Sequence, residues 1–141
     1  TPLDVPDRSF DLNYSYSVFT HLTEANHIAW LKEFARVLKP GGVMLLTTHS
    51  YECLRRLALF SPESLEKYRL GCPLPEFISK PMNYYWVDDG THDPEYGLAV
   101  ISKDYILKNW PAHSGMKILE FAEGAVEASP EGCQDVVLLR N

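Results

Sequence analysis

The chain has 141 residues, of which 45% are hydrophobic and 23% charged, as in an ordinary globular domain. The 13 Lys and Arg residues against 19 Asp and Glu give a formal net charge of −6. This acidic balance argues against nucleic acid as a partner, because affinity for nucleic acid depends on cations that neutralise phosphates. No apolar run approaches the ~20 residues that cross a bilayer, which argues against a membrane partner. We therefore expect a single domain, residues 1–141.

The cysteines and histidines carry no metal-site pattern. Cys53, Cys72 and Cys133 form no C-x-x-C pair, and the five histidines lack the spacings that bind zinc. Three is also an odd number, whereas a secreted disulfide framework favours an even one. We expect reduced thiols, no metal and a cytoplasmic location.

The first half of the chain reads as strand, helix, strand. Phe10–Tyr16 alternates apolar and polar residues, a pattern typical of a half-buried strand. Thr23 can cap a helix whose apolar stripe extends to Leu38. Lys39–Gly42 then ends the helix, because proline cannot continue it and glycine turns freely. Val43–Thr48 is a continuous apolar run, which indicates a parallel strand buried on both faces.

The middle of the chain is harder to assign. Tyr51–Phe60 has helical spacing, and Ser61–Arg69 begins with a cap and a first-turn proline that favour a second short helix. After that, prolines and glycines interrupt the chain up to Ser102. We predict about thirty residues of little regular structure there, typical of a functional lid or a mobile loop.

Regular structure returns at the C-terminal end. Ser102 is a plausible cap for a helix over Lys103–Trp110, which Pro111 should end. Met116–Phe121 and Gln134–Arg140 are apolar strand patterns with a short connection, so we expect them to pair antiparallel. The sequence therefore predicts an α/β fold with a mixed sheet of about four strands and flanking helices.

Polar side chains follow both parallel strands. Ser15, Ser17 and His21 come at the end of the first, and His49 follows the second. Ligands bind outside the carboxyl ends of the strands in open parallel sheets, so these side chains mark a candidate site. The alternative is that the hydroxyls only satisfy nearby backbone groups at a strand-to-helix turn.

Three segments in this order resemble the central motifs of class I S-adenosylmethionine-dependent methyltransferases. They are Pro6–Leu12, Ser15–Leu22 and Arg36–Gly42, and their spacing matches that family. The tail is similar as well, with a helix containing Tyr105–Trp110 and a final strand containing Gln134–Leu139. The resemblance implies part of a Rossmann-like sheet, in which Phe10–Tyr16 is the fourth strand.

S-adenosylmethionine is the cofactor that this resemblance implies. Its methionine side would lie against the end of the fourth strand and the turn after it. The implied cofactor-binding residues are Ser15, Tyr16, Ser17, Phe19 and His21. The family carries variable substrate-recognition elements where this chain has residues 50–101, so we expect an insertion or lid there.

A small-molecule methyl acceptor is the expected partner. The candidate substrate-binding residues are His49, Tyr84, Tyr85, Trp86 and His92. The alternative for the aromatic side chains is packing of the lid onto the edge of the sheet. His49 and His21 are the candidate catalytic bases, because histidine titrates near neutral pH.

The chain also departs from the family. The glycine-rich cofactor loop, the first three strands and the acidic residue that holds the ribose have no counterpart here, and the sequence contains no G-x-G. The resemblance thus covers the C-terminal half of a methyltransferase domain, so activity is expected of a longer protein and not of this fragment alone. The alternative is a non-catalytic half-domain. In either case we expect the open edge of Phe10–Tyr16 to pair with a second copy, as a homodimer or by domain swapping. A nicotinamide-dependent enzyme is disfavoured, because its phosphate-binding fingerprint is absent.

Overall fold

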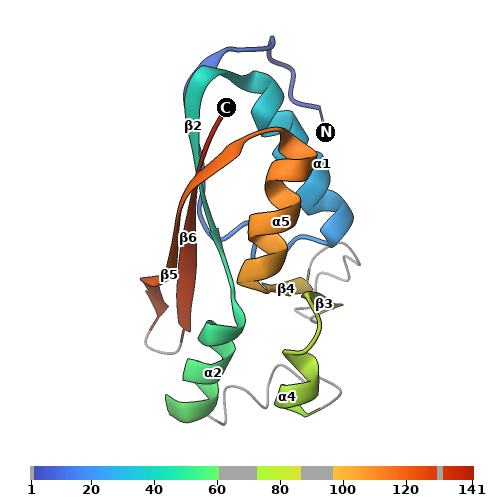
Figure 1. Ribbon diagram of the computed structural model, residues 1–141, viewed down its shortest axis with the longest axis vertical. Coiled ribbons are helices and arrows are strands. Elements are labelled where there is room, and N and C mark those ends of the chain that lie inside the picture. The colour runs from blue at the N-terminus through green and yellow to red at the C-terminus, as the bar shows by residue number, and fades with distance from the viewer. Residues whose placement is uncertain (1, 61–72, 87–96, 130–131) are drawn as a thin grey trace.

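The computed structural model describes residues 2–60, 73–86, 97–129 and 132–141. Its centre is a mixed sheet of order β1-β2-β6-β5, seen on the left of Figure 1. β1 (Phe10–Ser15) and β2 (Leu38–Thr48) are parallel. β6 (Gly132–Arg140) runs antiparallel to both β2 and β5 (Lys117–Ser129). The predicted α/β class, with two parallel strands and an antiparallel C-terminal hairpin, is confirmed.

Two helices cover one face of this sheet. α1 (Glu24–Val37) and α5 (Lys103–Ser114) lie side by side in Figure 1. The predicted cap of α1 is present, since Thr23 Oγ1 accepts a hydrogen bond from the backbone N–H of Asn26 at 3.3 Å. None of the described helices is long and apolar enough to span a membrane. The fully buried residues between the helices and the sheet form the main core: Phe19, Leu31, Leu38, Met44, Leu46, Ile101, Ile106, Trp110, Met116, Val137 and Leu139.

The connection between α1 and β2 is shorter than the sequence predicted. β2 begins at Leu38, directly after the helix, and not at Val43. Phe10 pairs with Leu38 but Leu12 with Val43, so the intervening residues form a bulge. Gly42 fits this bulge because a Cβ there would meet the carbonyl oxygens of Lys39 and Asp11 at 2.9 and 3.1 Å.

Among the described residues, β2 is more completely buried on one face than on the other, whereas the sequence predicted equal burial on both. Met44 and Leu46 point into the core and are fully buried, whereas Val43 and Leu45 on the opposite face are half-buried. In the described part of the chain, α1 and α5 both contribute to the core on the first face. The second face has apolar side chains but lacks comparable cover.

β1 shows the same asymmetry more strongly. Its apolar side chains point outward: Leu12 is 56% and Tyr14 75% exposed, whereas the polar Ser15 is buried. β1 is also an edge strand of the described sheet. An edge strand with an apolar outer face is a surface on which further chain can pair and pack.

α5 is longer than predicted. Ser102 caps it as expected, accepting from the N–H of Tyr105 at 3.1 Å, but the helix passes through Pro111 to Ser114. The end predicted at Pro111 was therefore wrong. Gly115 ends the helix in a left-handed conformation, with φ 75° and its N–H bonded to the carbonyl of Pro111. Trp110, fully buried just before the proline, anchors this last turn in the core.

The segment predicted to be irregular contains regular structure. α2 (Tyr51–Phe60) is present as predicted, followed by the short α4 (Leu74–Phe77) and an antiparallel hairpin of β3 (Met82–Trp86) and β4 (Gly97–Ile101). Every residue of β4 is buried, and tertiary contact accounts for a strand that local pattern did not predict. The helix predicted over Ser61–Arg69 lies outside the described residues.

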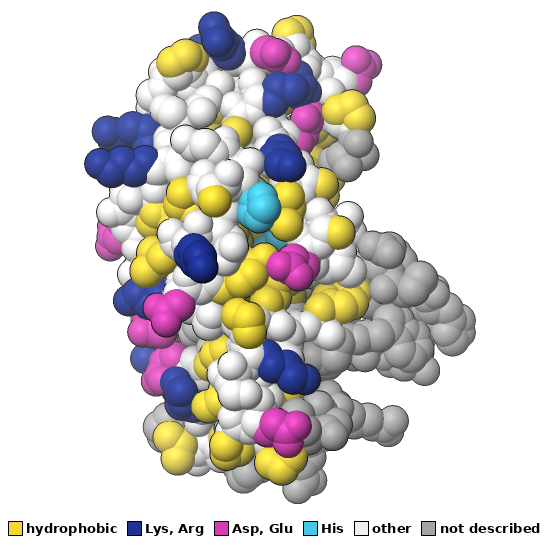
Figure 2. Space-filling model, turned by 45° about the vertical axis from the view of Figure 1, so that its right-hand side comes forward, with side chains coloured by type: hydrophobic (Ala, Val, Ile, Leu, Met, Phe, Trp, Pro, Cys, Tyr) yellow, Lys and Arg dark blue, Asp and Glu magenta, His cyan; other side chains and the backbone are white. Residues whose placement is uncertain are grey.

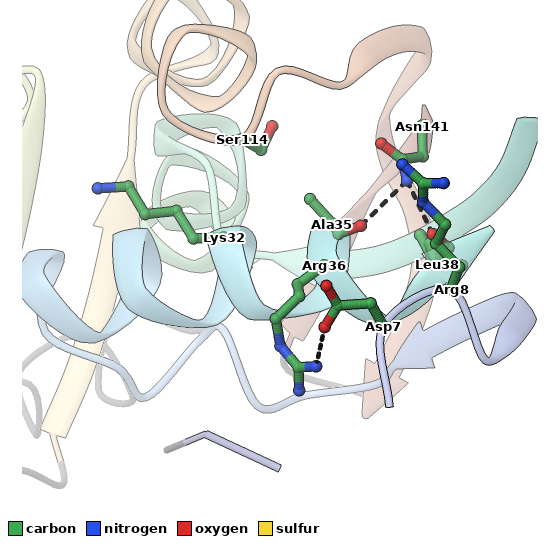
Figure 3. A pocket seen from close by; sticks show the side chains of 8 residues that line it. All are labelled: Asp7, Arg8, Lys32, Ala35, Arg36, Leu38, Ser114 and Asn141. Atoms are coloured by element: carbon green, nitrogen blue, oxygen red, sulfur yellow. Dashed lines mark hydrogen bonds and ion pairs between the residues drawn. The ribbon is translucent and has the colours of Figure 1, made fainter. Parts of the chain in front are cut away.

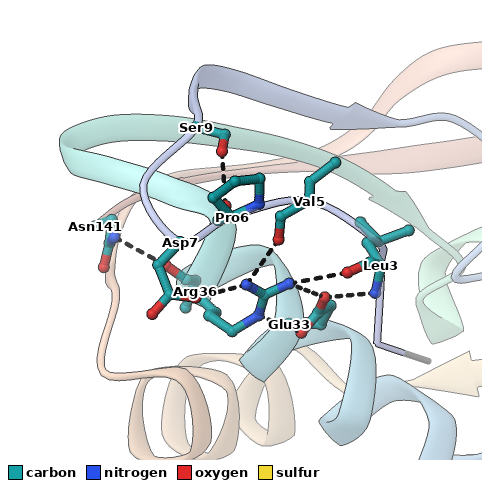
Figure 4. A network of polar contacts seen from close by, with 9 residues as sticks. Leu3, Val5, Pro6, Asp7, Ser9, Glu33, Arg36 and Asn141 are labelled. Carbon is teal, nitrogen blue, oxygen red and sulfur yellow. Dashed lines mark hydrogen bonds and ion pairs between the residues drawn. The ribbon is translucent and has the colours of Figure 1, made fainter.

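A single guanidinium fastens the N-terminal segment to α1 (Figure 4). Arg36 donates to both carboxylate oxygens of Glu33 at 2.6 and 2.9 Å, and to Asp7 Oδ1 at 2.6 Å. It also donates to the carbonyls of Leu3 and Val5. The hydrogen bonding of Arg36 to Glu33 is the largest of the effects that lower the pKa of this carboxyl to about 2. The network holds residues 3–9 against the helix at the amino end of β1.

Candidate functional site

β4 joins the carboxyl ends of the two parallel strands. The N–H of Ala99 donates to the carbonyl of Thr20 after β1, and the N–H of Ile101 donates to the carbonyl of His49 after β2, both at 2.8 Å. In Figure 1 this meeting point lies in the lower half of the molecule, away from the two termini. The structure thus brings together the two strand ends that the sequence marked as a candidate site.

Ser17 occupies an unusual conformation at the end of β1. Its φ of 57° is left-handed, a region that a non-glycine residue enters at a cost of about 1–2 kcal/mol. Two contacts hold it there: its N–H donates to Thr47 Oγ1 at 2.8 Å, and its Oγ accepts from Gln134 Nε2 at 2.9 Å. Because Oγ is the acceptor in the second contact, its own hydrogen can be donated to a ligand.

Two further hydroxyls are buried at the same edge. Thr20 and Thr48 are fully buried, and their Oγ1 atoms have no hydrogen-bond partner among the described residues. A buried hydroxyl without a partner costs free energy, and a bound water, ion or polar ligand is one way to satisfy it. These hydroxyls and Ser17 together make this edge suited to a polar ligand.

The two histidines lie near each other. His21 Nδ1 donates to the carbonyl of Gly97 at 2.8 Å, which places the proton of the neutral ring on Nδ1 and leaves Nε2 as the basic nitrogen. Burial, and then the neighbouring His21, lower the pKa of His49 to about 4. His49 is therefore neutral at pH 7, the form in which imidazole can accept a proton.

The remaining residues expected beside the cofactor differ in exposure. Ser15 is buried and Tyr16 half exposed, on opposite faces of the chain at the end of β1. Phe19 is buried in the core, with its ring edge-on to His27 at 4.9 Å between centroids and 5.7 Å from Trp110. Phe19 thus anchors the turn that follows β1 in the core.

The residues expected to contact substrate are less completely described. Tyr84 is half-buried on β3, and its backbone pairs with Ala99. Tyr85 and Trp86 continue β3 in register with Leu98 and Gly97. His92 lies outside the described residues. β3 therefore belongs to the hairpin that adjoins the site through β4.

Sequence reasoning did not single out three residues that build the site. Thr47 and Gln134 hold Ser17, but Gln134 lies 117 residues away from it in the sequence, so no local pattern links them. Asn83 supports the hairpin by donating to Tyr51 Oη and to the Phe77 carbonyl, both at 2.9 Å. For Thr47, the signal available in the sequence was its position at the end of an apolar strand.

A hollow of about 390 Å³ lies at the other end of the sheet (Figure 3). Arg8, Lys32 and Arg36 line it together with Asp7 and Ser114. It adjoins the amino end of β2, at Leu38, whereas ligands of open parallel sheets bind at the carboxyl ends. Arg36 is also engaged in the network described above, so this hollow is not the candidate site.

Comparison with known proteins agrees with this fold. A family model described as a methyltransferase domain matches residues 1–46, which include β1, α1 and most of β2. An S-adenosylmethionine-dependent methyltransferase from Methanosarcina mazei is similar in structure, with a TM-score of 0.59 and 17% identity over 99% of this chain. One from Mesorhizobium loti matches with a TM-score of 0.63, also at 17% identity and over 99% of this chain.

A third similar structure contains ligands. It is the 1,6-didemethyltoxoflavin-N1-methyltransferase of Burkholderia thailandensis, with 1,6-didemethyltoxoflavin and S-adenosylhomocysteine bound; its TM-score is 0.63 at 9% identity over 99% of this chain. This chain covers 62% of the Methanosarcina protein, 65% of the Mesorhizobium protein and 46% of the Burkholderia protein. The chain therefore has the fold of the S-adenosylmethionine-dependent methyltransferases over part of their length, and its resemblance to the class I family is confirmed.

Proposed function

We propose that this chain is the C-terminal half of a methyltransferase domain that transfers a methyl group from S-adenosylmethionine to a small acceptor, as part of a longer protein. The observation that carries this proposal is the polar edge formed by Ser17, Thr20 and Thr48 where β4 joins the ends of β1 and β2. It coincides with the edge at which open parallel sheets bind ligands. The exposed apolar side chains of Leu12 and Tyr14 on β1 further support a longer domain.

The residues present fit one side of the cofactor. Ser17 has a hydroxyl hydrogen to donate. Hydrogen bonds with Thr47 of β2 and Gln134 of β6 hold it in position. The half-exposed ring of Tyr16 offers apolar contact beside it. Together with Ser15 and His21, these residues would hold the methionine side, and Phe19 would support the turn from within the core. The cofactor supplies an already activated methyl group, so the protein mainly aligns the acceptor and excludes water.

His49 and His21 are the proposed bases for an acceptor that must lose a proton. His49 is neutral at pH 7 because its pKa is about 4, and His21 is oriented by the Gly97 carbonyl. A weak base of this kind suits an acceptor that becomes acidic as its new bond forms. β3, with Tyr84, Tyr85 and Trp86, and the segment containing His92 would recognise the acceptor. Residues 50–101 are thus the proposed substrate-recognition insertion.

A nucleic-acid acceptor is disfavoured on charge. The formal net charge is −6, and on the face shown in Figure 2 the Lys and Arg side chains alternate with Asp and Glu. A phosphate backbone is bound by clustered cations that neutralise several phosphates at once. The surface in view lacks such a stripe, which supports a small-molecule acceptor.

Replacing Ser17 with alanine tests the cofactor site. In the full-length gene product, Ser17→Ala should weaken the affinity for S-adenosylhomocysteine by roughly 10- to 150-fold, because one hydrogen bond to a charged group contributes roughly 1.5–3 kcal/mol. Isothermal titration measures the change. Ser9→Ala is the matched control, since Ser9 Oγ donates only to the Pro6 carbonyl at the far end of β1. Equal affinities of both variants and the wild type would contradict the proposal.

One observation favours a second candidate function, a half-domain that assembles with itself. β1 is an edge strand whose outward side chains Leu12 and Tyr14 are largely exposed. Exposed edges of this kind pair readily with another chain. On this alternative the 141-residue chain is a dimer at micromolar concentration by light scattering, and Tyr14→Lys shifts it to the monomer. Lys108→Glu is the control, because Lys108 is an exposed residue of α5. A monomeric wild-type chain would exclude the alternative.

A further inference from the structure

Cys53 and Cys133 are 80 residues apart in the sequence, yet their sulfur atoms lie 2.8 Å apart. Cys53 belongs to the first turn of α2 and Cys133 to β6, and both are buried free thiols. The separation is only about 0.8 Å longer than the roughly 2.05 Å of a disulfide bond. No large movement of the backbone is needed to join them.

The groups around the two thiols differ in charge. Asp135 Oδ1, which accepts from the N–H of Gly124 at 2.7 Å, lies 4.0 Å from Cys53 Sγ. Burial, and then Asp135, raise the pKa of Cys53, so this thiol stays protonated. Arg56, one turn further along α2, packs over Gly124. An electrostatic interaction with Cys133 is the largest cause of the raised pKa of Arg56, so this guanidinium lies near Cys133.

We propose that Cys53 and Cys133 form a reversible disulfide that clamps α2 to β6. Hydrogen peroxide is the oxidant, small enough to reach a largely buried sulfur. The Cys133 sulfur attacks one peroxide oxygen and water leaves, which gives a sulfenic acid. The Cys53 sulfur then attacks the oxidised sulfur, forms the S–S bond and releases a second water. Two thiols and one peroxide thus give one disulfide and two waters, and a dithiol reductant reverses the reaction.

The position of the clamp connects it to the strand ends. α2 begins two residues after His49, and Gln134, next to Cys133, donates to Ser17. The disulfide would therefore fix both strand ends relative to each other. An effect on cofactor affinity rests on the proposed function; formation of the disulfide does not.

Mass spectrometry of the oxidised chain tests the clamp directly. The test uses a Cys72→Ser background, since Cys72 lies outside the described residues. After peroxide treatment and alkylation in denaturant, most of the chain should have lost two hydrogen atoms and escaped alkylation at both cysteines. Proteolysis should yield one cross-linked peptide pair containing Cys53 and Cys133. Full alkylation of both thiols, or oxidation of each one separately to sulfinic acid, would overturn the proposal.

Thermal unfolding provides a second readout. The disulfide closes a long loop, so the Tm of the oxidised chain should rise by roughly 5–15 °C and return on reduction with dithiothreitol. Cys133→Ser should fold and show no such rise. Peroxide that leaves the Tm of the Cys72→Ser chain unchanged would count against the clamp. Disulfide formation in a full-length protein that binds no S-adenosylhomocysteine would support the clamp and overturn only the proposed function.

Discussion

Replacing Trp110 with alanine should lower the free energy of unfolding by about 3–5 kcal/mol, the usual loss when a large aromatic side chain is removed from a core. Trp110 is 1% exposed, and its ring lies 5.7 Å from Phe19 and 5.9 Å from His27 between centroids. It joins α5 to the turn that carries the candidate site. Since domains of this size are stable by about 5–15 kcal/mol, the loss is a large fraction of the total.

Urea unfolding followed by circular dichroism measures this loss by linear extrapolation. Leu107→Ala is the matched control, because Leu107 lies on the same helix but is 43% exposed. We expect it to cost less than about 1 kcal/mol, as for most surface substitutions. Similar losses for the two variants would show that α5 does not pack against the core as described.

Acid should destabilise the fold through His27. Burial lowers the pKa of His27 to about 4, whereas the unfolded value is 6.5. The unfolded chain therefore binds a proton more readily than the folded chain between these values. The stabilising contribution is complete above pH 6.5 and is lost as the pH falls towards 4, by about 3 kcal/mol in total.

Unfolding free energies measured from pH 7.5 to 4 test this contribution. His27→Phe keeps an aromatic ring between Phe19 and Trp110 but removes the titrating group. Its stability should therefore fall less steeply with pH than that of the wild type. A residual slope is expected from His49, whose pKa is also about 4, and His49→Gln should reduce it. A slope unchanged by His27→Phe would contradict the buried, neutral state of this ring.

Local signals predicted the elements at both ends of the chain. Thr23 and Ser102 are caps in the structure as predicted, because the side-chain contact that caps a helix spans only three residues. The strand β2 was recognisable from its apolar run, although its start at Leu38 was not. The bulge there depends on the pairing with β1, which the sequence around Gly42 does not encode by itself.

Long-range contacts determine what the sequence did not predict. β4 is tied to the carbonyls of Thr20 and His49, so its strand conformation depends on segments far away in the chain. The hydrogen bond from Gln134 to Ser17 also joins residues far apart in the chain. Likewise, the two cysteines are brought together only by the packing of α2 on β6. The ends of the two parallel strands lie together as predicted, because topology alone places them at one edge.

The location of the cofactor site is the central claim, and an NMR titration tests it most directly. S-adenosylhomocysteine is added to the isotopically labelled full-length gene product, and the backbone amide shifts are followed. We expect saturable changes concentrated at residues 15–21 and 47–50, with little change around Arg8, Lys32 and Arg36. Absence of binding by the folded protein, or changes confined to the hollow at the opposite end of the sheet, would contradict the account.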